Sequence, residues 1–178
     1  VLVATSHKSQ HTILKSSSQV PLPSHLNRHT FLSNYQVINM GFNDPQVIKN
    51  IAFGNRVADL KADEINAPVI GWTFNGGANQ QWTLEPEHGK EYKISTTAAG
   101  NIVYVSSKEP AAGDNLTVGG ESSVYTVQEY NGFYHISIHT EDGTILYWTL
   151  SNAANGTKIT LKPANNTVNQ LWALNAAT

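Results

Sequence analysis

The chain of 178 residues contains no cysteine and few charged residues. Without thiols it can form no disulfide framework, no thiolate metal site and no cysteine nucleophile, so packing must supply its stability. Charged residues make up 13% of the sequence and the formal net charge is -2. Because nothing here provides a basic surface, neither nucleic acid nor an anionic membrane is an expected partner.

Long apolar runs are also missing. No stretch approaches the length of a membrane span, so membrane insertion is not expected. The apolar start, Val1 to Ala4, is short and is soon followed by Ser6, His7 and Lys8, which is not typical of a secretory signal. These features favour a location in the cytoplasm or secretion by a non-classical route. The length fits one compact domain with an extension.

What the sequence does contain is a threefold internal repeat from about Gln46 to Thr178. Each copy opens with a short alternating strand, at 47–51, 92–95 and 134–138. A glycine turn follows, at Gly54-Asn55, Gly100-Asn101 and Asp142-Gly143-Thr144, where positive φ would let the chain fold back as a hairpin. A second strand then lies at 57–60, 102–105 and 145–148, and a third at 69–72, 116–119 and 159–162. The closing segments are 80–84, 123–127 and 170–174.

This pattern predicts an all-β domain without helices, because alternation with period two recurs throughout and no helical period appears. Three four-stranded units can remove exposed sheet edges by closing into a common barrel, which is a β-trefoil. We expect residues 46–178 to form this domain and residues 1–45 to form an N-terminal extension or arm, rich in Ser, Pro and His, with one strand at 35–38.

Two segments carry a family resemblance: Asn79-Gln80-Gln81-Trp82 and Asn169-Gln170-Leu171-Trp172. They resemble the Gln-x-Trp signature of ricin-B-type β-trefoil lectins, and the first repeat is similar to fungal members. Trp82, Tyr125 and Trp172 occupy equivalent positions in the three repeats, so we expect them to pack in a shared core. The glutamines are expected to hold the preceding loop through amide hydrogen bonds.

The resemblance implies a sugar site built from an Asp on the second strand, an aromatic after the third strand and an Asn before Gln-x-Trp. The first repeat supplies Asp59, Trp72 and Asn79. We add Gly71, which would let the ligand come close to the backbone, and Gln80. A galactose-type ring suits this set, because its 3- and 4-hydroxyls can donate to one carboxylate and its C–H face can lie on an indole. Since Ala58 and Leu60 match apolar pairs in the other repeats, we expect Asp59 to face outward, open to ligand.

The other repeats lack this set. Aligned on the second strand, Tyr104 and Tyr147 replace the Asp, and Gly119 and Lys162 replace the aromatic. One site per chain for galactose or N-acetylgalactosamine is therefore expected, and agglutination of cells would then require a homodimer or larger assembly, with the N-terminal segment as a candidate to mediate it.

Other chemistry has little support in the sequence. We expect no cofactor, no metal site and no catalytic residues: His135 and His139 are expected to face solvent on a strand, and Glu85 and Glu87 to lie in a loop. Two alternatives remain. One is a β-trefoil protease inhibitor that acts through a surface loop, and the other is a carbohydrate-binding part of a larger hydrolase or pore-forming toxin.

Overall fold

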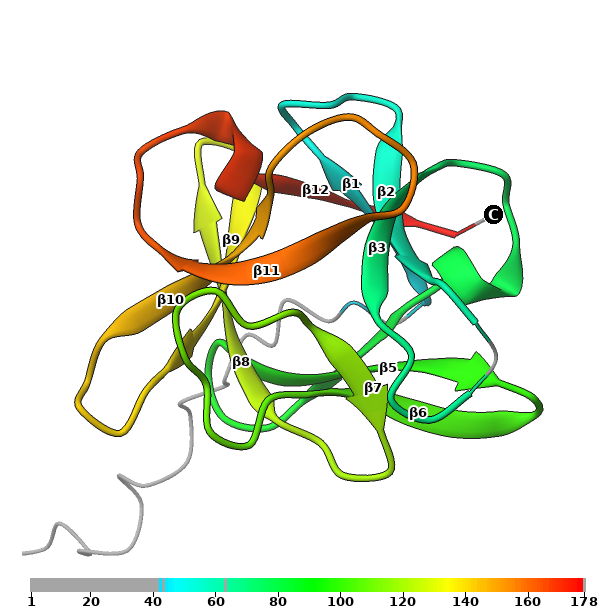
Figure 1. Ribbon diagram of the computed structural model, residues 1–178, viewed down its shortest axis with the longest axis horizontal. Helices are drawn as coiled ribbons and strands as arrows, with labels where there is room; N and C mark the ends of the chain where they lie inside the picture. The colour runs from blue at the N-terminus through cyan, green and yellow to red at the C-terminus, as the bar shows by residue number, and fades with distance from the viewer. Residues whose placement is uncertain (1–41, 43, 63, 178) are drawn as a thin grey trace, which may run out of the picture. The chain divides into compact units, whose positions relative to one another are not determined.

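The computed structural model describes residues 42, 44–62 and 64–177, and these form an all-β domain (Figure 1). The first repeat contains β1 (Gln46–Asn50), β2 (Arg56–Leu60), β3 (Val69–Thr73) and β4 (Thr83–Pro86). The second contains β5 (Glu91–Ala98), β6 (Asn101–Ser106), β7 (Thr117–Gly119) and β8 (Val124–Tyr130). The third contains β9 (Phe133–His139), β10 (Ile145–Leu150), β11 (Thr157–Pro163) and β12 (Trp172–Ala176). The expected plan of four strands per repeat is confirmed. The strand expected at 35–38 lies outside the described residues.

Two single 3₁₀ turns, η1 (Ala78–Gln80) and η2 (Val168–Gln170), interrupt this all-β plan. Each is three residues long, too short to leave a helical period in the sequence. Each covers the Asn-Gln pair that precedes a buried tryptophan. In the described residues no helix is long and apolar enough to cross a membrane.

The first and last strands of the repeats close into a barrel. β1 pairs with β12, β12 with β9, β9 with β8, β8 with β5, and β5 with β4. The ring closes where Gln46 and Trp82 exchange two backbone hydrogen bonds of 2.7 and 2.9 Å. The middle strands form hairpins at one end of the barrel, where β3 of the first repeat lies beside β11 of the third (Figure 1).

The core contains equivalent residues from each repeat. Ile48, Ile94 and Ile136 are fully buried, and so are Trp82, Tyr125 and Trp172. The indole nitrogen of Trp82 donates to the carbonyl of Ala58 at 2.9 Å, and that of Trp172 donates to the carbonyl of Trp148 at 3.1 Å. The expected shared aromatic core is confirmed.

One aromatic of this barrel comes from the segment before the first repeat. The ring of Phe42 lies 5.6 Å from that of Tyr92 and 5.7 Å from that of Tyr134, both edge-on. The carbonyl of Pro45 also accepts a hydrogen bond from Ala177 at 2.7 Å. Residues just before β1 therefore pack with the trefoil.

The glycine turns differ from each other in backbone conformation. Gly100 and Gly143 have φ values of +80° and +83°, as the hairpin signal predicts. Gly54 is not among the positive-φ residues, so the expectation for that turn is wrong. The turn is closed instead by the amide of Arg56, which donates to the carbonyl of Phe53 at 2.6 Å.

Candidate functional site

Asp59 and Trp72 lie on the same face of the β2–β3 hairpin. Asp59 is directly opposite Ile70, and Val57 is directly opposite Trp72. Opposite residues in an antiparallel pair share a face, and so do residues two apart in one strand. Ala58 and Leu60 belong to the barrel core. The prediction that Asp59 points away from the core is therefore confirmed.

Asp59 is nevertheless not open to solvent. Asp59 is only 4% exposed, and its Oδ2 accepts a hydrogen bond of 2.7 Å from Nε2 of Gln80. The alternation revealed the face of the strand but not the η1 segment that covers it, so the expectation of an open carboxylate is wrong. Burial raises the pKa of Asp59, and hydrogen bonds from Gln80 and Asn79 partly oppose that rise.

Gln80 clamps the loop that precedes it. Its Oε1 accepts from the backbone amide of Asn75 at 2.8 Å, and its Nε2 donates to the carbonyl of Thr73 at 3.0 Å as well as to Asp59. The side chain is fully buried, and these three contacts use most of its hydrogen-bonding capacity. The expected scaffold role of this glutamine is confirmed.

Trp72 offers a partly open indole. It is 38% exposed, although most tryptophans are largely buried. A loop of the third repeat borders it: a methyl group on Gly156 would lie 3.9 Å from Cζ3 of Trp72. Asn155 fixes this loop, because its Oδ1 accepts from the backbone amide of Thr73 at 3.0 Å. Sequence reasoning missed this border, since the loop lies about 80 residues further along the chain.

Asn79 lies at the end of β2, beside Asp59. Its Nδ2 donates to the carbonyl of Leu60 at 3.3 Å, and its side chain is half-buried. It also borders a hollow of about 520 Å³ at the junction with the second repeat. Asp59 and Trp72 do not line that hollow, so the three side chains do not line one deep pocket.

Gly71 has a different role from the one expected. It is opposite Ala58 and therefore faces the core. A Cβ at this position would lie 2.7 Å from Cδ1 of Leu150, a distance that real Cβ atoms do not tolerate. The explanation of Gly71 as a place where ligand approaches the backbone is wrong, because its free side faces a packed leucine.

The third repeat contains the same clamp with one change. Gln170 donates to Oγ1 of Thr149 and to the carbonyl of Pro163, both at 2.9 Å, and accepts from the amide of Asn165 at 3.0 Å. Thr149 therefore occupies the place of Asp59, and not Tyr147 as the sequence alignment predicts.

The strand registers show where that alignment fails. Trp72 pairs with Val57, Gly119 with Tyr104 and Lys162 with Tyr147. The two tyrosines therefore match Val57, and the residues that match Asp59 are Ser106 and Thr149. A shift of two residues keeps every side chain on the same face, so the hydrophobic pattern cannot detect it. In either alignment the second and third repeats lack an acid paired with an aromatic.

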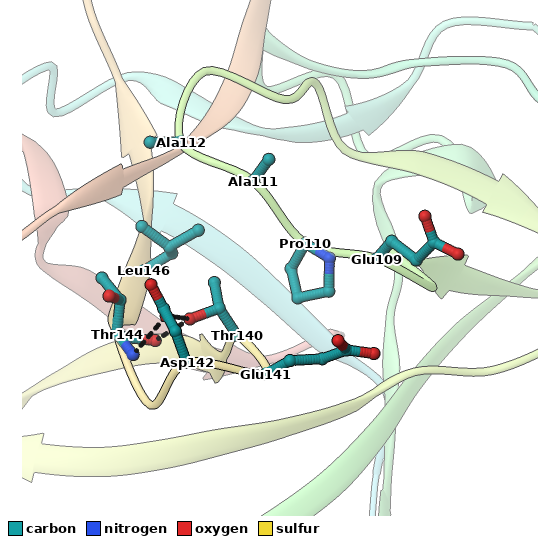
Figure 2. A pocket seen from close by; sticks show the side chains of 9 residues that line it. All are labelled: Glu109, Pro110, Ala111, Ala112, Thr140, Glu141, Asp142, Thr144 and Leu146. Atoms are coloured by element: carbon teal, nitrogen blue, oxygen red, sulfur yellow. Dashed lines mark hydrogen bonds between the residues drawn. The ribbon is translucent and has the colours of Figure 1, made fainter.

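A different hollow, of about 610 Å³, lies between the loop at 109–112 and the turn at 140–144 (Figure 2). Glu109, Glu141 and Asp142 line it. Asp142 is engaged in its own turn, where Oδ1 accepts from Thr140 Oγ1 and from the amide of Thr144 at 3.0 Å. These hydrogen bonds lower the pKa of Asp142, whereas a general acid needs a raised pKa.

The remaining candidates from the sequence have structural contacts. His135 is half-buried against the rings of Tyr130 and Tyr147, so the expectation that it faces solvent is wrong, whereas His139 is exposed. Glu85 lies on β4 and not in a loop as expected, and it accepts from Ser95 at 2.9 Å; Glu87 lies after that strand and pairs with Lys93. In the described part of the chain no group of three or more His, Cys, Asp or Glu side chains could hold a metal ion.

Comparison with known proteins identifies the fold through structure and not through sequence. No protein-family model and no curated protein matches the chain. The Rhizoctonia solani agglutinin is similar at a TM-score of 0.65 and 22% identity, over 75% of this chain and 94% of that one. The Macrolepiota procera ricin B-like lectin, solved in complex with lactose, is similar at 0.61 and 22%, over 74% and 94%.

A larger protein contains the same fold. A mosquitocidal holotoxin is similar at a TM-score of 0.64 and 23% identity, over 76% of this chain, but the chain spans only 17% of the holotoxin. The shared arrangement thus occurs both in proteins of about this size and as one part of a long chain. The described residues have the β-trefoil fold of the ricin B-like lectins.

Proposed function

We propose that this protein is a lectin that binds galactose or N-acetylgalactosamine through one site in its first repeat. Asp59, Trp72 and Asn79 form the site, and Gln80 holds it in place. The fold supports this proposal, since it is shared with an agglutinin and with a lectin in complex with lactose. Because one fold can host unrelated functions, the argument depends on the side chains.

The observation that carries the proposal is the difference between Asp59 and Thr149. Both accept a hydrogen bond from the glutamine of their repeat, at 2.7 and 2.9 Å. Folding of this motif therefore requires an acceptor but no charge. Burying a carboxylate without an opposite charge is unfavourable, so the charge at Asp59 exceeds what the scaffold needs. Accepting hydrogen bonds from the hydroxyl groups of a sugar would explain why this position carries a charge.

Each side chain has a defined part in the complex. A carboxylate has about four acceptor positions, of which Gln80 occupies one on Oδ2 and Asn79 another; the 3- and 4-hydroxyls of the ring donate to the two that remain. Low exposure strengthens these bonds, because hydrogen bonds are stronger where water is excluded. The indole of Trp72 supports the apolar face of the sugar, and the amide of Asn79 contacts a further hydroxyl.

Replacing Asp59 by threonine tests the proposal, because threonine is the residue that the third repeat has at the equivalent position, Thr149. Asp59→Thr keeps the acceptor for Gln80, so the free energy of unfolding should change by no more than about 1 kcal/mol. Binding of lactose should fall at least about tenfold, because a hydrogen bond to a charged acceptor contributes about 1.5 to 3 kcal/mol.

Calorimetric titration with lactose measures the affinity, and thermal unfolding checks the fold. The matched control is Thr149→Ser, which keeps the acceptor in the third repeat and should leave lactose binding unchanged. A folded Asp59→Thr protein that binds lactose as tightly as the parent would show that this acid is not the sugar acceptor.

The structure supports the two alternative functions, protease inhibitor and carbohydrate-binding part of a larger protein, to different degrees. No contact of the described residues favours a protease inhibitor. A role as the carbohydrate-binding part of a larger protein agrees with the place of this fold within the holotoxin, and it uses the same site. The galactose-type site is therefore common to the isolated lectin and to such a larger protein.

A further inference from the structure

A third hollow, of about 440 Å³, lies on the outer face of the first repeat. Its floor is formed by β1 and β2, and the chain that follows β3 forms one wall. The residues that line it are Val47, Lys49, Gly54, Asn55, Val57, Phe74, Gly76, Gln81, Asn175, Ala176 and Ala177. Its volume is within the range of small-ligand sites.

The hollow and the sugar site share one row of the sheet. Lys49 of β1 is directly opposite Val57 of β2, and Val57 is directly opposite Trp72 of β3. Directly opposite residues face the same side, and neighbouring strands are about 4.8 Å apart, so Lys49 and Trp72 lie about 10 Å apart across this face. Two linked sugar rings can cover that span.

The lining has the composition of a sugar subsite. The ring of Phe74, two residues after Trp72 in the chain, is 53% exposed and offers an aromatic surface in the hollow. Asn55, Gln81 and Asn175, which carry side-chain amides, line the same hollow. A flat apolar surface with amides at its rim is the combination that binds the C–H face and the hydroxyls of a pyranose.

The described lining of the hollow carries one positive charge and no negative one. Among the residues that the structure describes, Lys49 is the only charged one that borders it. The salt bridges among the described residues join Lys93 to Glu87 and Lys108 to Glu121, so none involves Lys49. A half-buried lysine that forms no salt bridge with any described carboxylate favours an anionic ligand.

We propose that this hollow is a subsite for an anionic sugar linked to the galactose-type ring, with Lys49 holding its acidic group and Phe74 supporting its ring. The inference depends on the proposed function, because the neighbouring ring occupies the site at Asp59 and Trp72. The shared chemistry of the ligand is a sugar that carries a carboxylate or a sulfate. The subsite would make charged galactosides better ligands than lactose.

Calorimetric titration of the full chain with lactose, 6′-sialyllactose and 6′-sulfated lactose tests this subsite, because a substituent on the 6-hydroxyl leaves the 3- and 4-hydroxyls of galactose free to donate to Asp59. The parent protein should bind at least one of the two charged sugars about five- to tenfold more tightly than lactose, and added salt should reduce the difference. Lys49→Gln should remove the preference and leave lactose affinity unchanged, whereas Lys49→Arg should keep it. The two charged sugars distinguish a carboxylate subsite from a sulfate subsite, and either result supports the proposal.

Matched controls lie in the third repeat. Lys162→Gln makes the same change of charge at an exposed position there, and it should keep the preference. Phe74→Ala should weaken binding of the charged sugars, whereas Phe133→Ala, which removes another exposed ring, should not. Equal binding of charged and neutral sugars, or a preference that survives Lys49→Gln, would overturn the subsite. Failure of the parent to bind lactose at all would instead overturn the proposed function.

Discussion

Asp59 carries a buried carboxyl group on the outer face of the β2–β3 hairpin. Its position on the outer face follows from alternation, yet Gln80 and the η1 turn cover it almost completely. Its charge is therefore expensive to bury, and its pKa is raised by that burial. A residue of this kind should respond to pH both in ligand binding and in its effect on stability.

Binding should weaken as pH falls through the raised pKa of Asp59, because only the carboxylate can accept from two sugar hydroxyls. The loss should begin above the ordinary value of 3.8 for an aspartate. Titration of lactose affinity against pH, from neutral downward, measures the midpoint. A midpoint at or below the ordinary value would contradict the burial of this group.

The effect on stability has the opposite direction. Since the pKa is higher in the folded than in the unfolded protein, the folded state binds more protons between the two values. The contribution of Asp59 to the free energy of unfolding is therefore full below the ordinary value and is lost as pH rises through the raised one. Asp59→Asn serves as the control, because the difference in stability between it and the parent isolates this group from Glu87 and Asp142, whose pKa values are lowered.

At the scale of the element, the clamp formed by glutamine and 3₁₀ turn is used twice, in η1 and η2. Gln80 and Gln170 each accept from a backbone amide five residues earlier in the chain and donate to the carbonyl that ends the preceding strand. The two differ in their third partner, which is a carboxylate in one and a hydroxyl in the other. The same element therefore serves folding in both repeats, but it positions an acid in only one.

Removing each glutamine should separate these roles. Gln80→Ala and Gln170→Ala should each lower the free energy of unfolding by about 1 to 3 kcal/mol, because each leaves buried groups without a hydrogen bond. Only Gln80→Ala should also reduce lactose binding, since it releases Asp59. Chemical denaturation and lactose titration of both variants provide the measurements. Equal loss of binding in the two would place a sugar in the third repeat as well.

The elements also show how far the sequence could predict this molecule. The three repeats, their strands and the buried aromatics follow from alternation and from the similar spacing of Trp82, Tyr125 and Trp172, because these patterns depend on the barrel itself. The match of Tyr147 to Asp59 failed because a shift by two residues preserves alternation. Alternation places Gly71 on the core side of β3. The reason for a glycine there is the side chain of Leu150, which lies in another repeat and which no local pattern relates to Gly71.

Contacts between repeats lie beyond such patterns. The loop that ends at Gly156 borders Trp72, and the ring of Phe42 completes an aromatic cluster with Tyr92 and Tyr134. Both contacts join residues far apart in the chain, where no local period relates them. The sequence therefore predicts the components of the proposed site better than it predicts their surroundings.

At the scale of the whole molecule, a nearly symmetric scaffold carries an asymmetric set of side chains. The pair Asp59 and Trp72 corresponds to Ser106 and Gly119 in the second repeat and to Thr149 and Lys162 in the third. Symmetry of the fold thus does not imply three sites. The second and third repeats serve instead as two internal controls for the proposed site of the first repeat.

One lactose should therefore bind per chain. Titration calorimetry at high protein concentration measures this ratio, and magnetic resonance spectra with added lactose should show shifts confined to the first repeat and the 151–156 loop. A monosaccharide in so shallow a site should bind weakly, near 1 mM, which corresponds to about -4 kcal/mol. A ratio of two or three, with shifts near Thr149 or Ser106, would contradict the single site and would show that a hydroxyl at this position binds sugar as well as a carboxylate does.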